Sequence, residues 1–175
     1  MSDAPSRLAP REVAQLLRAT TVTLAAELAA LPPPVLAWHP APGEWCAKDV
    51  LGHLIEAEQR GFAGRIRIIL AGPDPQLHTW DQNEVASARR DCEREGGELL
   101  RELASLRQDS LQLVEGLGDA DLPRGGHHPK VGYLEIRDLL NEWVHHDRNH
   151  VRQILANVQG YVWPHMGATQ RFSAP

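Results

Sequence analysis

Cysteine is scarce in this chain of 175 residues, and long apolar runs are missing. The two cysteines, Cys46 and Cys92, are too few for the disulfide framework of a secreted protein, and both are expected to be small buried residues. Because no run reaches about 18 apolar residues, no segment is predicted to span a membrane. The amino-terminal residues 1–7 lack the basic and apolar regions of a signal peptide. These absences favour a cytoplasmic protein.

A positively charged surface is also missing. The net charge is −5, and no basic stripe is interleaved with aromatic residues, so a nucleic-acid partner is not expected. The hydrophobic fraction of 42% and the charged fraction of 23% are ordinary for a globular protein. The length predicts one domain over residues 1–175, large enough to fold without a disulfide or a structural metal. A bound metal would therefore be functional.

Four segments have the apolar spacing of amphipathic helices, and proline or glycine separates them. The predicted helices cover residues 10–31, residues 47–71, a third segment from a start between residues 83 and 97 to residue 117, and residues 133–158. Gly96-Gly97 is expected to kink the third helix and Gly160 to end the fourth. No segment alternates as a strand would. The pattern predicts an all-α fold, a four-helix bundle with a long crossover between the second and third helices.

Nine histidines raise the question of which ones the fold brings together. Residues advance by about 100° around a helix, and with Ile136 at zero the apolar arc of the fourth helix runs from roughly 300° to 60°. His150 falls inside this arc near 320°, His146 at its edge near 280°, and His145 on the opposite face near 180°. Histidines four residues apart on one face suit two nitrogens at about 2.0–2.1 Å from one zinc-like ion.

His53 on the second helix faces a groove between helices, because it lies about 40° from Ala57 and 60° from Val50. It is either a groove histidine with an ordinary hydrogen-bond partner or a third ligand opposite the pair on the fourth helix. Bundles build metal sites in the second way. Three protein ligands would leave positions open for water or substrate, which is typical of catalytic sites. Facing alone leaves both interpretations open.

Two blocks of the sequence resemble the DinB/YfiT-like superfamily. The first is E-W-C-A-K-D-V-L-G-H-L over residues 44–54, and the second is H-D-R-N-H-V-R-Q-I over residues 146–154. The stretch G-Y-L-E-I-R-D-L-L over residues 132–140 extends the resemblance over nearly the whole chain. The combination of a W-x-x-x-[DE]-x-L-x-H-L block with an H-D-x-x-H-x-x-Q-I block is specific for this group.

The resemblance implies a divalent metal, nickel or zinc, held by His53 from the second helix and by His146 and His150 from the last. It also implies a homodimer, for which the apolar stretch at residues 161–164 offers a surface. Characterised members include S-transferases that use low-molecular-weight thiols, and others are assigned as metal-dependent hydrolases. A thiol S-transferase acting on small electrophiles is therefore the first expectation. A metal-dependent hydrolase of a small molecule is the second, and a non-catalytic metal-binding stress protein is the third.

Hydrolysis calls for a general base, usually a carboxylate beside the metal. Asp49 lies one turn before His53 and Glu56 one turn after it, so both could approach the ion. Asp81, in the crossover, could fold over the mouth of the site. These three carboxylates are the candidate catalytic residues.

Other polar residues receive a structural interpretation. Glu142, one turn before His146, is expected at the surface. Asp147 lies within the inward arc near 20° and needs a partner such as Arg65 or Arg67.

Cys46 stands at the predicted start of the second helix, where relatives commonly have serine. A thiol caps a helix poorly, and its pKa tends to fall at a helix N-terminus, so a reactive Cys46 is the alternative to a small buried residue. His127 and His128 lie in a glycine-rich loop that is either an ordinary surface loop or part of the site mouth. The spacing gives no partner to Cys92 or His39.

Overall fold

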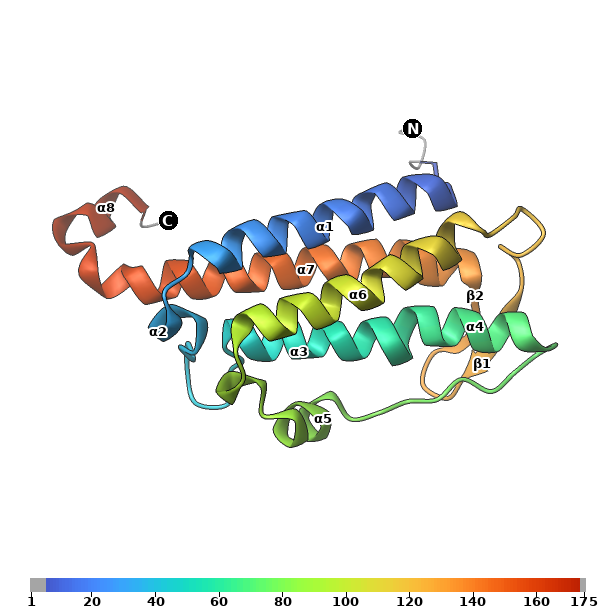
Figure 1. Ribbon diagram of the computed structural model, residues 1–175, viewed down its shortest axis with the longest axis horizontal. Coiled ribbons are helices and arrows are strands. Elements are labelled where there is room, and N and C mark those ends of the chain that lie inside the picture. Colours follow the sequence, from blue (N-terminus) through green and yellow to red (C-terminus); the bar gives the residue numbers. More distant parts are fainter. Residues whose placement is uncertain (1–5, 174–175) are drawn as a thin grey trace.

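The computed structural model describes residues 6–173 of the chain. Within these residues, four long helical rods lie side by side (Figure 1). They are α1 (Pro10–Ala30), α3 (Ala47–Glu56) with its continuation through η1 (Ala57–Phe62) and α4 (Ala63–Ala71), α6 (Gly96–Glu115) and α7 (Ile136–Val162). The four-helix bundle that the sequence predicts is confirmed. None of the helices among the described residues is long and apolar enough to cross a membrane.

The connections contain short elements that the apolar spacing did not resolve. They are α2 (Pro33–Leu36), α5 (Gln82–Arg89), η2 (Asp91–Glu93), η3 (Trp163–His165), η4 (Gly167–Thr169) and α8 (Gln170–Ser173). Gly96-Gly97 begins α6 instead of kinking it, because the preceding helical segment is the separate α5. The last rod does not end at Gly160 but continues to Val162, and the ring of Trp38 lies close against this glycine. The crossover runs back along the second rod to α5 (Figure 1).

A short hairpin, which the sequence analysis did not predict, precedes α7. Strand β1 (Gly125–His128) pairs antiparallel with β2 (Gly132–Glu135), with Gly125 opposite Glu135 and His128 opposite Gly132. The crossover adds to β1 through hydrogen bonds from Leu77 N to His127 O and from His127 N to Pro75 O, each 2.8 Å long. Strands of four residues are too short to show an alternating pattern. The hairpin and the crossover therefore form one wall at this end of the bundle.

Two apolar clusters fill the bundle. One surrounds Trp143 and Phe62, whose rings stack with centroids 5.0 Å apart. The other contains the apolar residues of α3 and packs against α1, α6 and the middle of α7. Its fully or nearly fully buried members include Leu24, Val50, Leu51, Leu54, Leu99, Leu103 and Ile154. On α7, His146 and His150 lie between the residues that belong to these two clusters.

The second rod is not a uniform α-helix, because η1 is a π-helical turn. A π-turn bonds residue i to residue i+5 and so accommodates one extra residue. A Cβ atom on Gly64 would lie 2.1 Å from the Gln59 carbonyl oxygen, five residues earlier, so the turn requires glycine at this position. The turn buries Glu58, which is 1% exposed, and Phe62, which is 5% exposed.

Cys46 and Cys92 are joined by a disulfide, which corrects the expectation that Cys92 has no partner. Cys46 is fully buried and is the N-cap residue of α3, as the sequence predicts. Cys92 comes from η2, and 46 residues separate the two positions in the chain. The spacing of the cysteines gave no indication of this pairing, because the crossover and α5 together bring η2 back to the start of α3.

Candidate metal centre

Three histidines from two rods meet inside the bundle. His53 projects from α3, and His146 and His150 project from one face of α7. One ring nitrogen from each lies within 4.8 Å of the others, and the Nε2 atoms of His53 and His146 are 3.0 Å apart. His145 is exposed and contacts Asn149, as its opposite facing predicts. We call His53, His146 and His150 the three-histidine cluster.

The hydrogen bonds of the cluster leave lone pairs directed at one another. His150 Nδ1 lies 2.9 Å from the amide oxygen of Gln153, which can only accept, so Nδ1 donates and Nε2 keeps its lone pair. At 3.0 Å, the Nε2 atoms of His53 and His146 cannot both carry a proton. His146 Nδ1 is buried and has no hydrogen-bond partner among the described residues. Neutral imidazoles arranged in this way fit a divalent cation.

Burial keeps the three rings neutral. Burial, together with the neighbouring His150, lowers the pKa of His53 to about 4. Burial likewise lowers the pKa of His146 to about 3, with contributions from His150, His53 and Arg107. The pKa of His150 is also lowered by burial. At neutral pH all three rings are therefore in the form that binds metal.

The cluster lies on the wall of a cavity of about 920 Å³. Aromatic rings support the histidines from behind: Trp45 packs on His53 at 4.9 Å between centroids, and Phe62 packs on His146 at 5.1 Å. The opposite wall comes from the crossover and the hairpin. The polar and charged residues lining the cavity include Arg65, Asp81, His128, Lys130, Asp138 and Glu142. A small molecule in this cavity would reach all three imidazoles.

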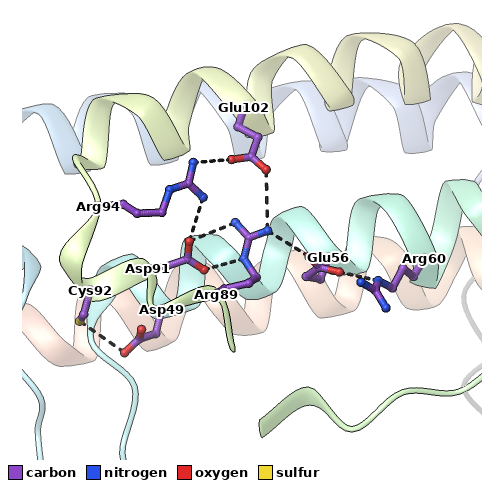
Figure 2. A network of polar contacts seen from close by, with 8 residues as sticks. All are labelled: Asp49, Glu56, Arg60, Arg89, Asp91, Cys92, Arg94 and Glu102. Carbon is purple, nitrogen blue, oxygen red and sulfur yellow. Dashed lines mark hydrogen bonds and ion pairs between the residues drawn. The ribbon is translucent and has the colours of Figure 1, made fainter. Parts of the chain in front are cut away.

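The predicted catalytic carboxylates have different surroundings. Asp49 accepts a hydrogen bond from Cys46 N at 3.1 Å, and Glu56 is paired with Arg89 at 3.0 Å (Figure 2). Neither belongs to the described residues that line the cavity. Asp81 does line it, although its Oδ1 accepts from the backbone N–H groups of residues 83 and 84 at the start of α5. The catalytic role of these three residues stays a prediction.

Glu142 is exposed, as expected, and also lines the cavity, one turn before His146 on the same helix. Its carboxylate therefore joins Asp81 and Asp138 as an acidic group that a bound molecule can reach.

A second buried polar group lies beside the histidines. Arg107 from α6 is 2% exposed and lies 2.7 Å from Asp147 and 2.9 Å from Glu58. Asp147 is buried with an arginine partner, as the sequence predicts, but that partner is Arg107 and not Arg65 or Arg67. Burial raises the pKa of Glu58 to about 7, against the opposing effect of Arg107. We call Arg107, Glu58 and Asp147 the arginine cluster.

Sequence reasoning missed the part of the site that the crossover and hairpin supply. Arg65 lies under the Trp80 ring, 5.2 Å from its centroid, and its Nη2 contacts His78 O at 3.2 Å and His128 Nε2 at 3.1 Å. His128 thus reaches the site mouth, one of the two alternatives left open for its loop. Arg65 Nε is buried and has no hydrogen-bond partner among residues 6–173. No spacing in the sequence connects these positions.

Comparisons with known proteins agree with this architecture. The sequence profile of the DinB superfamily matches residues 15–154. A solved structure of YfiT from Bacillus subtilis, described as a probable metal-dependent hydrolase with an unusual four-helix bundle topology, superposes with a TM-score of 0.82. The two chains are 18% identical over 93% of each, a likeness that concerns the fold. No curated protein matches the chain at a significant level. Thiol S-transfer receives no support from these comparisons.

Proposed function

The chain belongs to the DinB superfamily, and we propose that it is a metal-dependent hydrolase of a small molecule, with the metal held by the three-histidine cluster. One observation carries the proposal. Three partly buried, neutral imidazoles with converging nitrogens lie on the wall of a cavity large enough for a substrate. Three neutral ligands leave the full charge of a divalent ion available, and such an ion acidifies water and polarises a carbonyl or phosphoryl oxygen.

The residues around the cluster have separable roles in this proposal. Trp45 and Phe62 hold the rings of His53 and His146 and keep water from their rear faces. The Glu142 carboxylate, at the cavity wall, accepts the proton that hydrolysis releases. Arg65, which lines the cavity, presents its guanidinium charge to an oxygen of the substrate.

Imidazole nitrogens suit zinc, nickel, copper and iron alike, so the ligand type does not select the metal. We propose zinc or nickel because these are the ions that the family resemblance implies. The homodimer stays a prediction, to which the exposure of Val162 (46%) and Trp163 (41%) adds support.

Metal analysis of protein purified without a histidine tag provides the first test. We expect about one zinc or nickel ion per chain by elemental analysis of protein in which the Cys46–Cys92 disulfide is closed, and its loss in His53→Ala. His145→Ala serves as the matched control, because this histidine lies on the outer face of the same helix as His146. Absence of a stoichiometric ion, or its retention in His53→Ala, would refute the proposed metal site.

A substrate panel provides the second test. Chromogenic esters, amides and phosphoesters are offered to the metal-loaded protein with and without a low-molecular-weight thiol. We expect turnover in water alone and a loss of at least about 100-fold in Glu142→Gln, typical of removing a general base. Glu98→Gln, an exposed carboxylate on α6, is the control. Turnover that depends on added thiol would favour S-transfer and overturn the hydrolase proposal.

A further inference from the structure

Four side chains outside the three-histidine cluster meet at the first turn of α3. Cys46 caps the helix, Asp49 stands in its first turn, Cys92 comes from η2, and His39 comes from the loop after α2. Cys92 Sγ lies 3.4 Å from both His39 Nε2 and Asp49 Oδ2. One potential ligand atom from each of the four lies within 4.8 Å of the others. We call these residues the dithiol cluster.

The orientation of His39 is fixed by a hydrogen bond of its other ring nitrogen. Nδ1 lies 2.7 Å from the backbone carbonyl oxygen of Glu44. Because a carbonyl oxygen only accepts, Nδ1 carries the proton, and Nε2, the atom facing Cys92, carries a lone pair. Histidines that bind metal commonly donate their second nitrogen to a backbone carbonyl in this way.

The segment that carries Cys92 is held rigidly against the bundle. Arg89 and Arg94 both contact Asp91, at 2.6 Å and 3.0 Å, and both also reach Glu102 on α6 (Figure 2). A Cβ atom on Gly52 would lie 1.7 Å from Asp91 Oδ2, so only glycine at this position of α3 allows the approach. Asp91 is 1% exposed. The position of Cys92 relative to Cys46 is thus set by contacts that do not involve sulfur.

We propose that the reduced chain binds a second divalent ion, of the zinc class, between Cys46, Cys92, His39 and Asp49. Thiolate, imidazole and carboxylate are all ligand types that zinc takes in proteins, and four of them complete its usual tetrahedral coordination. Thiolates select zinc and its soft analogues over magnesium or calcium. The position of Cys46 at a helix N-terminus favours its thiolate. The proposal shares no residue with the three-histidine cluster and does not depend on the proposed hydrolase function.

Metal binding and the disulfide exclude each other at this cluster, because sulfurs joined to one another are not thiolate ligands. Closing the bond between Cys46 and Cys92 removes two electrons from the two thiolates. With hydrogen peroxide as the oxidant, these electrons and two protons from solvent convert the peroxide into two waters, and the ion loses two ligands. The structure holds the oxidised pair. In a reducing compartment the dithiol form, and with it the metal-bound form, would prevail.

Cobalt(II) titration tests the proposal, since thiolate ligands give cobalt an intense near-ultraviolet charge-transfer band that imidazoles do not. Untagged protein is reduced with a water-soluble phosphine, freed of reductant under nitrogen and titrated. We expect the band in the wild-type chain and in His53→Ala, and its disappearance in Cys46→Ser and Cys92→Ser. Serine is a good N-cap, so Cys46→Ser keeps the start of α3 intact. Zinc added afterwards should abolish the band.

A matched pair of histidine variants tests the imidazole ligand. His39→Ala should weaken cobalt binding at the dithiol cluster by at least about tenfold. Losing only the hydrogen-bond partner of a ligand already costs about this much, and losing the ligand itself should cost no less. His165→Ala, an exposed histidine near the end of α7, should leave the titration unchanged.

Peroxide treatment tests the exclusion. Added to the zinc-loaded reduced chain, it should release one equivalent of zinc to a chromophoric chelator, and Cys92→Ser should release none from this cluster. No charge-transfer band in the reduced wild-type chain, or a band that survives in both serine variants, would overturn the second site. Either result would leave the metal analysis of the three-histidine cluster unaffected, because His53→Ala separates the two.

Discussion

The three-histidine cluster and the arginine cluster are buried next to each other, yet their polar groups are satisfied in opposite ways. In the arginine cluster, Arg107 lies between two carboxylates, so each charge has a counter-charge within about 3 Å. In the three-histidine cluster, three bases face one another, and burial drives protons off them. In the first arrangement protein atoms supply the counter-charges, although Arg107 Nε and both Glu58 oxygens have no hydrogen-bond partner among the described residues. The second gains most from a cation that the chain does not supply.

This difference distinguishes buried groups with a structural role from buried groups with a functional role, without reference to any substrate. A buried group whose partner belongs to the protein holds helices in register, here α6, α7 and the π-turn η1. Buried groups that present lone pairs to one another and to a cavity are poised for a ligand. Substitutions in the two clusters and beside them test this difference.

Arg107→Met should have the largest effect on folding. It leaves Glu58 and Asp147 buried without a counter-charge, and breaking such a pair costs about 3–5 kcal/mol in the free energy of unfolding. Urea denaturation measures the loss. Arg18→Met, which removes an exposed pair with Glu115, should cost less than about 1 kcal/mol. Similar losses in the two variants would mean that the arginine cluster is not a structural element.

His146→Ala should show the reverse pattern. Metal affinity should fall by more than about 100-fold, because losing a ligand costs more than losing the hydrogen-bond partner of a ligand. The metal-free protein should keep its stability, because no buried charge is left unpaired. Competition with a chelator of known affinity gives the first quantity, and urea denaturation after chelation gives the second. If metal-free His146→Ala lost as much stability as Arg107→Met does, the proposed difference between the two clusters would be wrong.

Gln153→Ala should have a smaller effect on the same site. The Gln153 amide oxygen accepts from His150 Nδ1, and losing such a partner weakens metal binding by roughly 10–100-fold. Gln159→Ala, one of the next exposed positions along α7, should leave the chelator competition curve unchanged. Equal curves for Gln153→Ala and the wild-type chain would show that the hydrogen bond does not orient the ligand.

Glu58→Gln should change only the pH dependence of stability. The histidines, with pKa values of about 4 and about 3 against 6.5 when unfolded, contribute stability that is present above pH 6.5 and lost as pH falls. Glu58, with a pKa of about 7 against 4.5, contributes stability that is present below pH 4.5 and lost as pH rises through 7. The two contributions oppose each other, and the variant lacks the second.

Metal-free Glu58→Gln should therefore gain stability more steeply than the wild-type chain between pH 4.5 and 7. The difference should not exceed about 1.4 kcal/mol per pH unit, the slope for one proton. Urea denaturation at a series of pH values measures it, with Glu98→Gln as the control. Parallel curves for the variant and the wild-type chain would contradict a raised pKa at Glu58.

The sequence predicted those parts of the molecule in which neighbours along one helix decide the outcome. The spacing of apolar residues located the four rods, and helical facing distinguished His146 and His150 from His145. The position of His53 opposite them needed the family resemblance, because facing within one helix does not tell which helix lies across the groove. Cys46 as an N-cap was also local information.

The sequence did not predict which residues from distant segments of the chain become partners. Asp147 clearly needed a cation, but only the packing of α6 against α7 selects Arg107 over Arg65 or Arg67. The pairing of Cys46 with Cys92, and the approach of His39 to both, depend on the path of a crossover that has no periodicity. The hairpin that places His128 at the cavity was not predicted, because strands of four residues are too short to show a clear alternation of apolar and polar residues.

The π-turn at residues 57–62 also bears on how this fold tolerates change. An extra residue in a helix rotates everything that follows by about 100° relative to everything before it. Deleting one residue here would restore a regular helix but turn Ile66 and Ile69 away from the core while leaving His53 in place. The facing of the half that carries His53 and that of the half that carries Ile66 and Ile69 are therefore set independently, so sequence change on one side of the turn leaves the facing of the other side unaltered.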